Sequence, residues 1–223
     1  MLGVLYDIHG NLPALEAVLE QAETEGVDRW LLGGDYGTPS PWPFETLDRL
    51  RALPDATWIR GNGERWLREP PERAEVVDAY ERFLRDFPET EVEWLYALPP
   101  RAELDGVLYV HGSPLADDDS FAAEPQEVEE RLLAGVWGRL VVFGHSHRQF
   151  RRPGPDDTDL LNPGSVGMPL DGDRRAAWAV RADDGEFAFR RTEYDVERAV
   201  HAFRSLGGAF GELAAGRIER GSD

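Results

Sequence analysis

The chain has 223 residues, no cysteine and a formal net charge of −19, and all 24 of its basic residues are arginine. This length suffices for one domain with a sizeable core, here expected over residues 1–223. The lack of cysteine excludes disulfides, thiolate metal sites and a cysteine nucleophile, and the lack of lysine excludes Schiff-base chemistry. So acidic a chain has no footprint for general nucleic-acid binding or for an anionic membrane.

Membrane insertion and export are not expected either. No apolar run approaches the roughly 20 residues that span a bilayer. The first ten residues lack the basic segment and the long apolar segment of a signal peptide. We therefore expect a cytoplasmic protein without a membrane partner, and the sequence leaves homo-oligomerisation open.

The first part of the chain alternates between strands and helices. Apolar, β-prone runs predict strands over 2–6, 27–32 and 56–59. Apolar residues at helical spacing predict helices over 12–26, 44–53 and from about 60 to 68. Asn11 is expected to cap the first helix, which has Pro13 in its first turn and ends at Gly26.

The second part is richer in strands. Residues 72–98 predict one or two helices, and Asp105-Gly106 predicts a turn between strands 101–104 and 107–110. Further predictions are a helix over 127–133, a strand over 140–143, short strands over 148–193 with a hairpin around 183–185, a last helix from Asp195 to Phe203, and frayed residues from about 215. This order favours an α/β fold with two facing sheets flanked by helices.

Five short polar motifs each follow an apolar run and lie beside glycine. They read LYDIHGN (5–11), LLGGDYG (31–37), IRGNGE (59–64), LYVHGSP (108–114) and VVFGHSH (141–147). Strand ends are where an α/β fold collects the ligands of a common site. The motifs supply two carboxylates, four imidazoles and one amide: Asp7, His9, Asp35, Asn62, His111, His145 and His147.

These residue types suit a pair of transition-metal ions. In extended backbone, residues i and i+2 point to the same side, so Asp7 with His9, and His145 with His147, can each face one ion. Imidazole together with carboxylate favours Zn, Mn, Fe or Co over Ca or Mg. The sequence therefore predicts metal-assisted hydrolysis.

Plainer interpretations exist for single residues. Asp7 might serve as a helix cap, although Asn11 is better placed, and Asp35 and Asn62 each resemble ordinary turn residues. A buried histidine without a partner would be costly, which favours ligation for the other positions. Trp42 and Trp66 follow motif loops and belong either to the core or to the lining of a pocket.

Taken together, the motifs and the segment NPGSVGMP (162–169) resemble the calcineurin-like metallophosphoesterases, in their small bacterial and archaeal phosphodiesterase-like branch. The resemblance runs from residue 3 to about 180. It implies a four-layer α/β/β/α sandwich of the metallo-dependent phosphatase type, which hydrolyses a small phosphoester substrate with a hydroxide generated between two metal ions.

The resemblance also implies a ligand set. One ion would take Asp7, His9, Asp35 and His147, and the other would take Asp35, Asn62, His111 and His145, with Asp35 as the bridge. Manganese is the expected metal, with Fe, Zn, Ni or Co as alternatives. Asp35, Asn62 and His111 are the expected catalytic ligands. Asn11 and Arg60 are candidate substrate contacts, as is Arg148, and each arginine is equally well explained as a structural ion pair.

Two positions depart from the family pattern. Many members have histidine directly after the motif asparagine, where it protonates the leaving group, and this chain has Gly63. Tyr6 replaces the usual serine, and its phenol either packs in the core or tips into the site. Without the histidine acid, diesters are favoured over monoesters. A phosphomonoesterase acting on nucleotides or proteins, and a noncatalytic interaction module of the same fold, are the alternatives.

Overall fold

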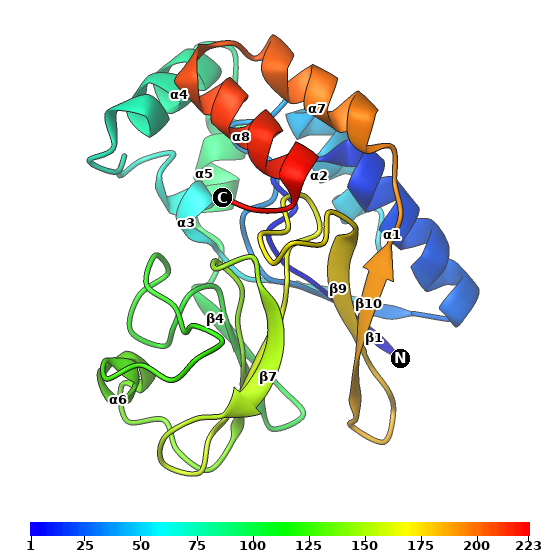
Figure 1. Cartoon of the computed structure of the whole chain (residues 1–223), viewed down its shortest axis with the longest axis vertical. Coiled ribbons are helices and arrows are strands. Elements are labelled where there is room, and N and C mark those ends of the chain that lie inside the picture. Colours follow the sequence, from blue (N-terminus) through cyan, green and yellow to red (C-terminus); the bar gives the residue numbers. More distant parts are fainter.

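The computed structural model describes residues 1–223 and contains two five-stranded sheets that face each other (Figure 1). The first sheet has the strand order β10-β9-β1-β2-β3 and the second has the order β4-β5-β6-β8-β7. The strands of the first sheet are β1 (Leu2–Leu5), β2 (Arg29–Leu32), β3 (Ala56–Trp58), β9 (Ala176–Arg181) and β10 (Phe187–Thr192). Those of the second sheet are β4 (Arg101–Leu104), β5 (Val107–Val110), β6 (Leu140–Val142), β7 (Gln149–Pro153) and β8 (Asp159–Pro163).

The central strands of both sheets are parallel. Strands β1, β2 and β3 run in one direction, as do β5, β6 and β8. Antiparallel strands β9 and β10 extend the first sheet, and β4 and β7 extend the second. The carboxyl ends of parallel strands meet at one edge of a sheet, and that is where open α/β sheets bind ligands.

Helices cover the outer faces of both sheets unevenly. Most helices lie over the first sheet, whereas only the short α6 and its neighbouring loops cover the second, so the expected four layers are present and the fourth is thin (Figure 1). The helices are α1 (Leu12–Glu25), α2 (Pro43–Arg51), α3 (Asn62–Arg65), α4 (Ala74–Leu84), α5 (Glu89–Tyr96), α6 (Glu129–Leu133), α7 (Val196–Ser205) and α8 (Gly208–Arg220).

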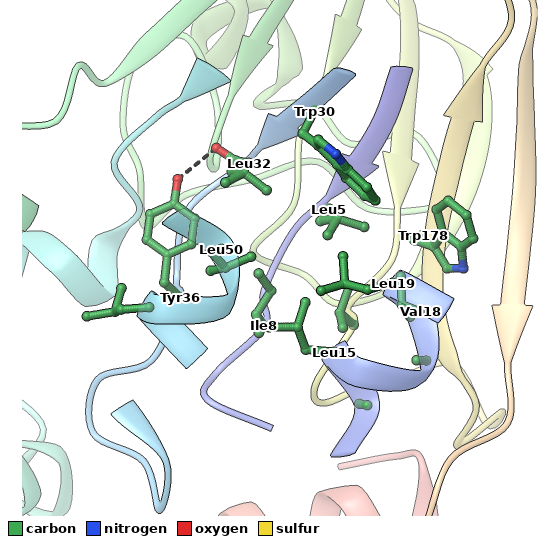
Figure 2. Close-up of a cluster of buried hydrophobic side chains, with 14 of the residues drawn as sticks. Leu5, Ile8, Leu15, Val18, Leu19, Trp30, Leu32, Tyr36, Leu50 and Trp178 are labelled. Carbon is green, nitrogen blue, oxygen red and sulfur yellow. Dashed lines mark hydrogen bonds between the residues drawn. The ribbon is translucent and has the colours of Figure 1, made fainter. Parts of the chain in front are cut away.

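Side chains of β1 alternate between two cores. Leu2 and Val4 pack between the sheets, and Leu5 packs against the helices. Figure 2 shows the helix-side core, where Leu15 and Leu19 of α1 approach Leu5. The end of β1 is thereby held from both faces, which fixes the start of the first polar motif.

Tyr6 lies in the core between the sheets and does not enter the site. Its ring is fully buried, and its hydroxyl donates to the carbonyl of Val142 across the two sheets, at 3.2 Å. A Cβ at Gly33 would lie 2.2 Å from the Tyr6 ring, and one at Gly144 would lie 2.5 Å from it. The glycines that precede Asp35 and His145 therefore leave room for this tyrosine.

Most predicted elements are present, with ends shifted by a few residues. Asn11 caps α1 by accepting a hydrogen bond from the amide of Ala14, and Gly26 ends the helix in a left-handed conformation. The hairpin of β4 and β5 has the predicted bounds, with Asp105 and Gly106 at positive φ. Residues 72–98 form two helices, α4 and α5.

The prediction that the residues after about 215 are frayed was wrong. Helix α8 covers Gly208–Arg220 and packs closely on α7, with Ala214, Ala215 and Ile218 buried. Glycines at 211 and 216 disfavour an isolated helix, and the packing on α7 compensates for that weak propensity.

None of the helices combines the length and the apolarity that crossing a bilayer requires.

Candidate metal centre

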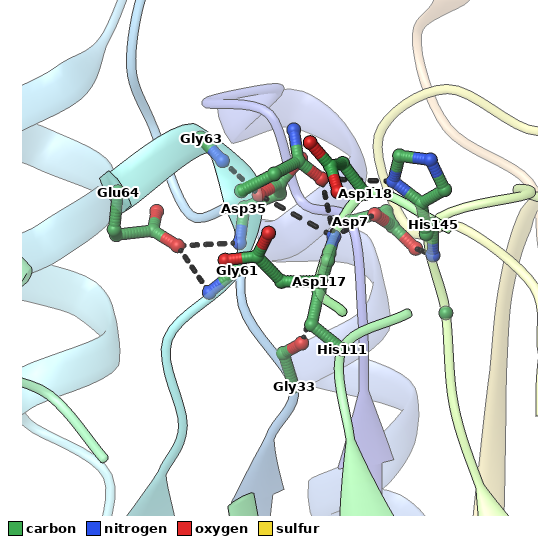
Figure 3. A network of polar contacts seen from close by, with 12 residues as sticks. Asp7, Gly33, Asp35, Gly61, Gly63, Glu64, His111, Asp117, Asp118 and His145 are labelled. Carbon is green, nitrogen blue, oxygen red and sulfur yellow. Dashed lines mark hydrogen bonds and ion pairs between the residues drawn. The ribbon is translucent and has the colours of Figure 1, made fainter. Parts of the chain in front are cut away.

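All seven predicted ligands lie at the carboxyl ends of parallel strands. Asp7 and His9 follow β1, Asp35 follows β2, and Asn62 follows β3 at the start of α3. The other three ligands come from the second sheet, His111 after β5 and both His145 and His147 after β6. The structure thus brings together residues that are up to 140 positions apart in sequence (Figure 3).

Five of these residues have a left-handed backbone. The φ angles are 52° at Asp7, 50° at His9, 56° at Asp35, 63° at His145 and 56° at His147. Residues with side chains rarely adopt this conformation, and such strain gathers at functional sites because the surrounding structure must enforce it. The backbone here is therefore shaped to aim side chains inward.

Two overlapping groups of side-chain atoms could each hold an ion. Asp7, His9 and His147 form one group, and Asp7, Asp35 and His111 form the other, with ligand atoms within 4.8 Å of one another in each. The two oxygens of Asp35 reach imidazoles of both groups, Oδ2 at 3.8 Å from Nε2 of His9 and Oδ1 at 3.5 Å from Nε2 of His111. Both aspartates are thus placed between the two groups, and the bridging role assigned to Asp35 stays a prediction.

Asp7 provides the clearest sign that this site suits a cation. Its side chain is fully buried, and Oδ1 has no hydrogen-bond partner. That oxygen lies 3.4 Å from Nε2 of His147, 3.7 Å from Nε2 of His111 and 3.8 Å from Nε2 of His9. A buried carboxylate oxygen without a donor is costly, and a cation among these nitrogens would satisfy it.

Two histidines are oriented by backbone carbonyls. Nδ1 of His111 donates to the carbonyl of Gly33 at 2.8 Å, and Nδ1 of His147 donates to the carbonyl of Met168 at 2.7 Å. A carbonyl only accepts, so Nδ1 carries a proton, and the neutral form of each ring therefore offers its Nε2 lone pair to a metal. Metal-ligating histidines in proteins are held in this way.

The other possible metal-binding atoms come close together at two places. Nε2 of His9 and Nε2 of His147 face each other at 3.0 Å. Oδ1 of Asn62 lies 3.0 Å from Nε2 of His111 and 2.8 Å from Nδ1 of His145. This mixture of imidazole, carboxylate and amide oxygen fits a pair of transition-metal ions by the chemistry of its donors.

Burial and neighbouring charges set the protonation of the site. Burial lowers the pKa of His9 to about 3, and burial also lowers that of His145 to about 4, so both rings are neutral near pH 7 and available as ligands. Burial would lower the pKa of His111 too, but the negative charges of Asp35 and Asp7 outweigh it and raise the value to about 9. Burial, together with Glu64 and Asp7, raises the pKa of Asp35 to about 7. Without a cation, the ionised form of the Asp35 carboxyl is therefore disfavoured.

Glu64 fixes the loop that carries Asp35, a role the sequence had not indicated. It is fully buried, and its carboxylate accepts hydrogen bonds from three backbone amides, those of Asp35 at 2.8 Å, Tyr36 at 2.8 Å and Gly61 at 2.9 Å (Figure 3). The amide of Gly63 donates to Oδ1 of Asp35 at 2.7 Å. Helix α3 and the Asp35 loop are thus held as one unit.

Gly63 has no left-handed backbone, so a side chain is not excluded by conformation. Space is tighter, because a Cβ there would lie 2.9 Å from Oδ1 of Asp35 and 3.4 Å from the Tyr80 hydroxyl. That hydroxyl donates to the carbonyls of Thr38 and Gly63.

The candidate substrate contacts have structural partners. Asn11 is fully buried, and besides capping α1 its amide donates to the carbonyl of Gly167 at 2.8 Å. Arg60 donates to the carbonyl of Tyr96 at 2.8 Å, and its guanidinium lies over the Tyr96 ring. Asn11 does not line the cavity described below, whereas Arg60 lines a second cavity of about 670 Å³ that His111 also lines.

A cavity of about 590 Å³ opens onto this centre. Its lining includes His9, Asp35, Asn62, His145 and His147, so five candidate ligands are accessible from it. This volume is in the usual range for a small-molecule site. Trp66 lines the cavity, whereas Trp42 lies elsewhere, under the guanidinium of Arg198.

Comparisons with known proteins agree with this geometry. Over 89% of this chain and 90% of the relative, the sequence is 26% identical to the "Uncharacterized protein MJ0912" of Methanocaldococcus jannaschii. A metallophosphoesterase from Sphaerobacter thermophilus superposes with a TM-score of 0.81 at 25% identity, covering 99% of this chain and 98% of that one. The hypothetical protein PH1004 of Pyrococcus horikoshii OT3 superposes with a TM-score of 0.81 at 20% identity over the whole of both chains.

The family match covers the part of the chain that carries every candidate ligand. Residues 1–185 match the Calcineurin-like phosphoesterase superfamily domain. That range contains all five polar motifs and every strand of both sheets except β10. With the fold, the clustered aspartates and histidines and this match in agreement, the chain belongs to the calcineurin-like phosphoesterase superfamily.

Proposed function

We propose that this protein is a metal-dependent phosphodiesterase that works with two divalent transition-metal ions, manganese being the preferred metal. The observation that carries the proposal is the fully buried Oδ1 of Asp7, which has no hydrogen-bond partner and faces three imidazole nitrogens. Membership of the calcineurin-like phosphoesterase superfamily supports the reaction class.

When bound, two such ions would neutralise charge on the phosphoryl oxygens and lower the pKa of a shared water toward neutrality. The chain's own residues prepare the place for this chemistry. His111 and His147 are held with their Nε2 atoms inward by backbone carbonyls, and Glu64 fixes the Asp35 loop. Groups fixed before the reaction need no reorganisation during it.

The preference for diesters rests on Gly63. A positioned acid helps most when the leaving group is a poor one, such as an alkoxide, and it contributes about 10²–10⁴-fold. The position directly after Asn62 is a glycine, which has no side chain that could donate a proton. Esters whose leaving group departs without protonation are therefore the expected substrates, and aryl diesters are the simplest test compounds.

The first prediction concerns metal dependence. Hydrolysis of bis(4-nitrophenyl) phosphate should stop in excess chelator and return on addition of manganese. Asp35→Ala should lower kcat/KM more than any other single ligand change, because each of its two oxygens lies near an imidazole of a different group. The loss should exceed the roughly 100-fold that is typical when a residue hydrogen-bonded to a metal ligand is removed. Exposed Asp48→Ala on α2 is the control for removal of an acidic residue and should leave the rate unchanged.

The outcomes separate the alternatives. Full activity in excess chelator would remove the metal mechanism. A higher kcat/KM for 4-nitrophenyl phosphate than for the diester would make the protein a phosphomonoesterase. A protein that holds no metal and turns over neither compound would be an interaction module.

A further inference from the structure

Helix α8 forms one side of the cavity that opens onto the candidate metal centre. Phe210, Leu213 and Arg217 line that cavity and repeat at helical spacing, while the opposite face of α8 packs on α7. Residues 208–220 lie outside the range that matches the superfamily domain, which ends at 185. This side of the cavity is therefore not part of the common hydrolytic machinery.

Two arginines from different segments of the chain line this side of the cavity. Arg217 comes from α8, and Arg148 directly follows the candidate ligand His147. Both line the cavity, as does Asp223. The carboxylate of Asp223 lies 2.7 Å from Arg217 and 3.6 Å from Arg148, and no other acidic group lies within 4.0 Å of either guanidinium.

The contact of Arg148 with Asp223 is loose compared with a structural ion pair of the same protein, whereas the contact of Arg217 with Asp223 is closer, at 2.7 Å. Arg65 makes three hydrogen bonds to Asp117, and these two side chains are 21% and 15% exposed. Arg148 and Asp223 are 47% and 57% exposed and make no hydrogen bond. Exposed ion pairs of this kind contribute little stability, so another anion can replace the carboxylate at small cost.

Arg217 has unused capacity for an anion. Its Nε is buried and has no hydrogen-bond partner. A phosphate group brings more charge and more acceptor oxygens than a carboxylate, and arginine binds it through several N–H groups at once.

We propose that Arg148 and Arg217 form a binding site for a second anionic group of the substrate, and that the Asp223 carboxylate occupies this site in the free protein. The substrate is then a phosphodiester that carries a further phosphate on the part of the molecule that reaches the outer cavity. This inference rests on the proposed function, and it identifies a substrate class for the same centre.

The test compares two compounds that differ only in the second anion. These are thymidine 5′-(4-nitrophenyl phosphate) and the same compound with a 3′-phosphate, and release of 4-nitrophenolate is measured for both with manganese-loaded protein. The quantity of interest is the ratio of the two kcat/KM values, phosphorylated over unphosphorylated. Asp223→Asn should raise this ratio by about 2–5-fold, since the internal competitor is weakened. Arg217→Gln and Arg148→Gln should each lower it by about tenfold.

Matched controls keep the result specific. Arg220→Gln removes a positive charge, and Glu212→Gln removes an exposed carboxylate, both from α8 at positions that do not line the cavity. Both variants should therefore leave the kcat/KM ratio unchanged. Melting temperatures of all variants show that they fold, and a gain of function in Asp223→Asn cannot arise from misfolding.

Two results would overturn the inference without touching the proposed function. The first is a kcat/KM ratio that stays at the wild-type value in all three variants, which would show that the Asp223 ion pairs are only structural. The second is an equal fall in kcat/KM for both compounds in Arg217→Gln, which would show that this arginine contacts the reacting phosphate. If wild type hydrolyses neither compound, nor bis(4-nitrophenyl) phosphate, the proposed function itself fails.

Discussion

At Gly63 the chain has a hydrogen atom where a side chain would point toward Asp35. We predict that Gly63→His raises kcat/KM for an alkyl phosphomonoester relative to an aryl diester, because the imidazole would protonate an alkoxide leaving group. A positioned acid contributes about 10²–10⁴-fold, and the lower end is expected here. The new Cβ would lie only 2.9 Å from Oδ1 of Asp35, so that carboxylate has to shift slightly.

Gly63→Ala is the control for this crowding, because it adds the Cβ without the imidazole. The alanine variant should lose activity on both substrates by the same factor, with its metal content measured first. If a folded, metal-loaded Gly63→His protein has the same substrate ratio as Gly63→Ala, the missing acid does not explain the preference for diesters.

Individual residues also show how far the sequence alone could lead. The clustering of the seven candidate ligands was predictable because each lies in a short motif after an apolar run, and the structure brings all seven side chains together. Arg217 and Glu64 had no such signal. Glu64 contacts the amides of residues 35 and 36 in another segment of the chain, and Arg217 shares the cavity and the Asp223 carboxylate with Arg148, which lies 69 positions earlier.

Helix α3 and the Asp35 loop are joined through a single buried carboxylate. We predict that Glu64→Gln lowers the free energy of unfolding by about 1–3 kcal/mol, because a glutamine NH₂ group would face backbone N–H donors and leave one of them unsatisfied. Asp35 would move with its loop, so manganese affinity should fall by about 10–100-fold. Urea unfolding and metal titration measure the two effects.

Glu69→Gln is the matched control. It lies one turn beyond α3, and its side chain is 53% exposed. This variant should stay within about 0.5 kcal/mol of wild type and keep its metal affinity. Equal effects of the two substitutions would show that Glu64 does not fix the loop.

Among whole elements, local signals decided which predictions succeeded. The Asp105-Gly106 turn fixed the β4–β5 hairpin, and the Asn11 cap fixed the start of α1, since both devices act within a few residues. Helix α8 has no side-chain cap at its start, has only the left-handed Gly221 at its end, and contains three glycines within its bounds. It forms because its buried face meets α7, a contact that neither helix reveals alone.

On the scale of the whole molecule, the candidate metal centre links the two sheets. Asp7, His9, Asp35 and Asn62 come from the first sheet, and His111, His145 and His147 come from the second. Any cation held by both sets therefore joins strands that otherwise meet through apolar packing and a few hydrogen bonds such as that of Tyr6. Metal binding and stability must be coupled, because ligands from separate strands are not assembled in the unfolded chain.

We therefore predict that manganese raises the melting temperature. At a free manganese concentration one hundredfold above the dissociation constant, the folded state gains about 2.7 kcal/mol. For a chain of this length, each kcal/mol corresponds to roughly 2–4 °C, so the expected increase is about 5–10 °C. Differential scanning calorimetry of metal-free and manganese-loaded protein measures it.

A rise in melting temperature also has a second explanation that must be tested. Because the net charge is −19, manganese could stabilise the protein simply by screening surface carboxylates. His9→Gln and His145→Gln separate the two effects, because each removes one ligand, from the first and from the second sheet respectively, without changing the acidic surface. Both imidazoles are neutral at pH 7, as their lowered pKa values require, so neither substitution removes a charge. Specific binding predicts that either variant loses most of the increase while its metal-free melting temperature changes little. Surface screening predicts the full increase in both variants, and that result would show that the two sheets are not linked through the metal centre.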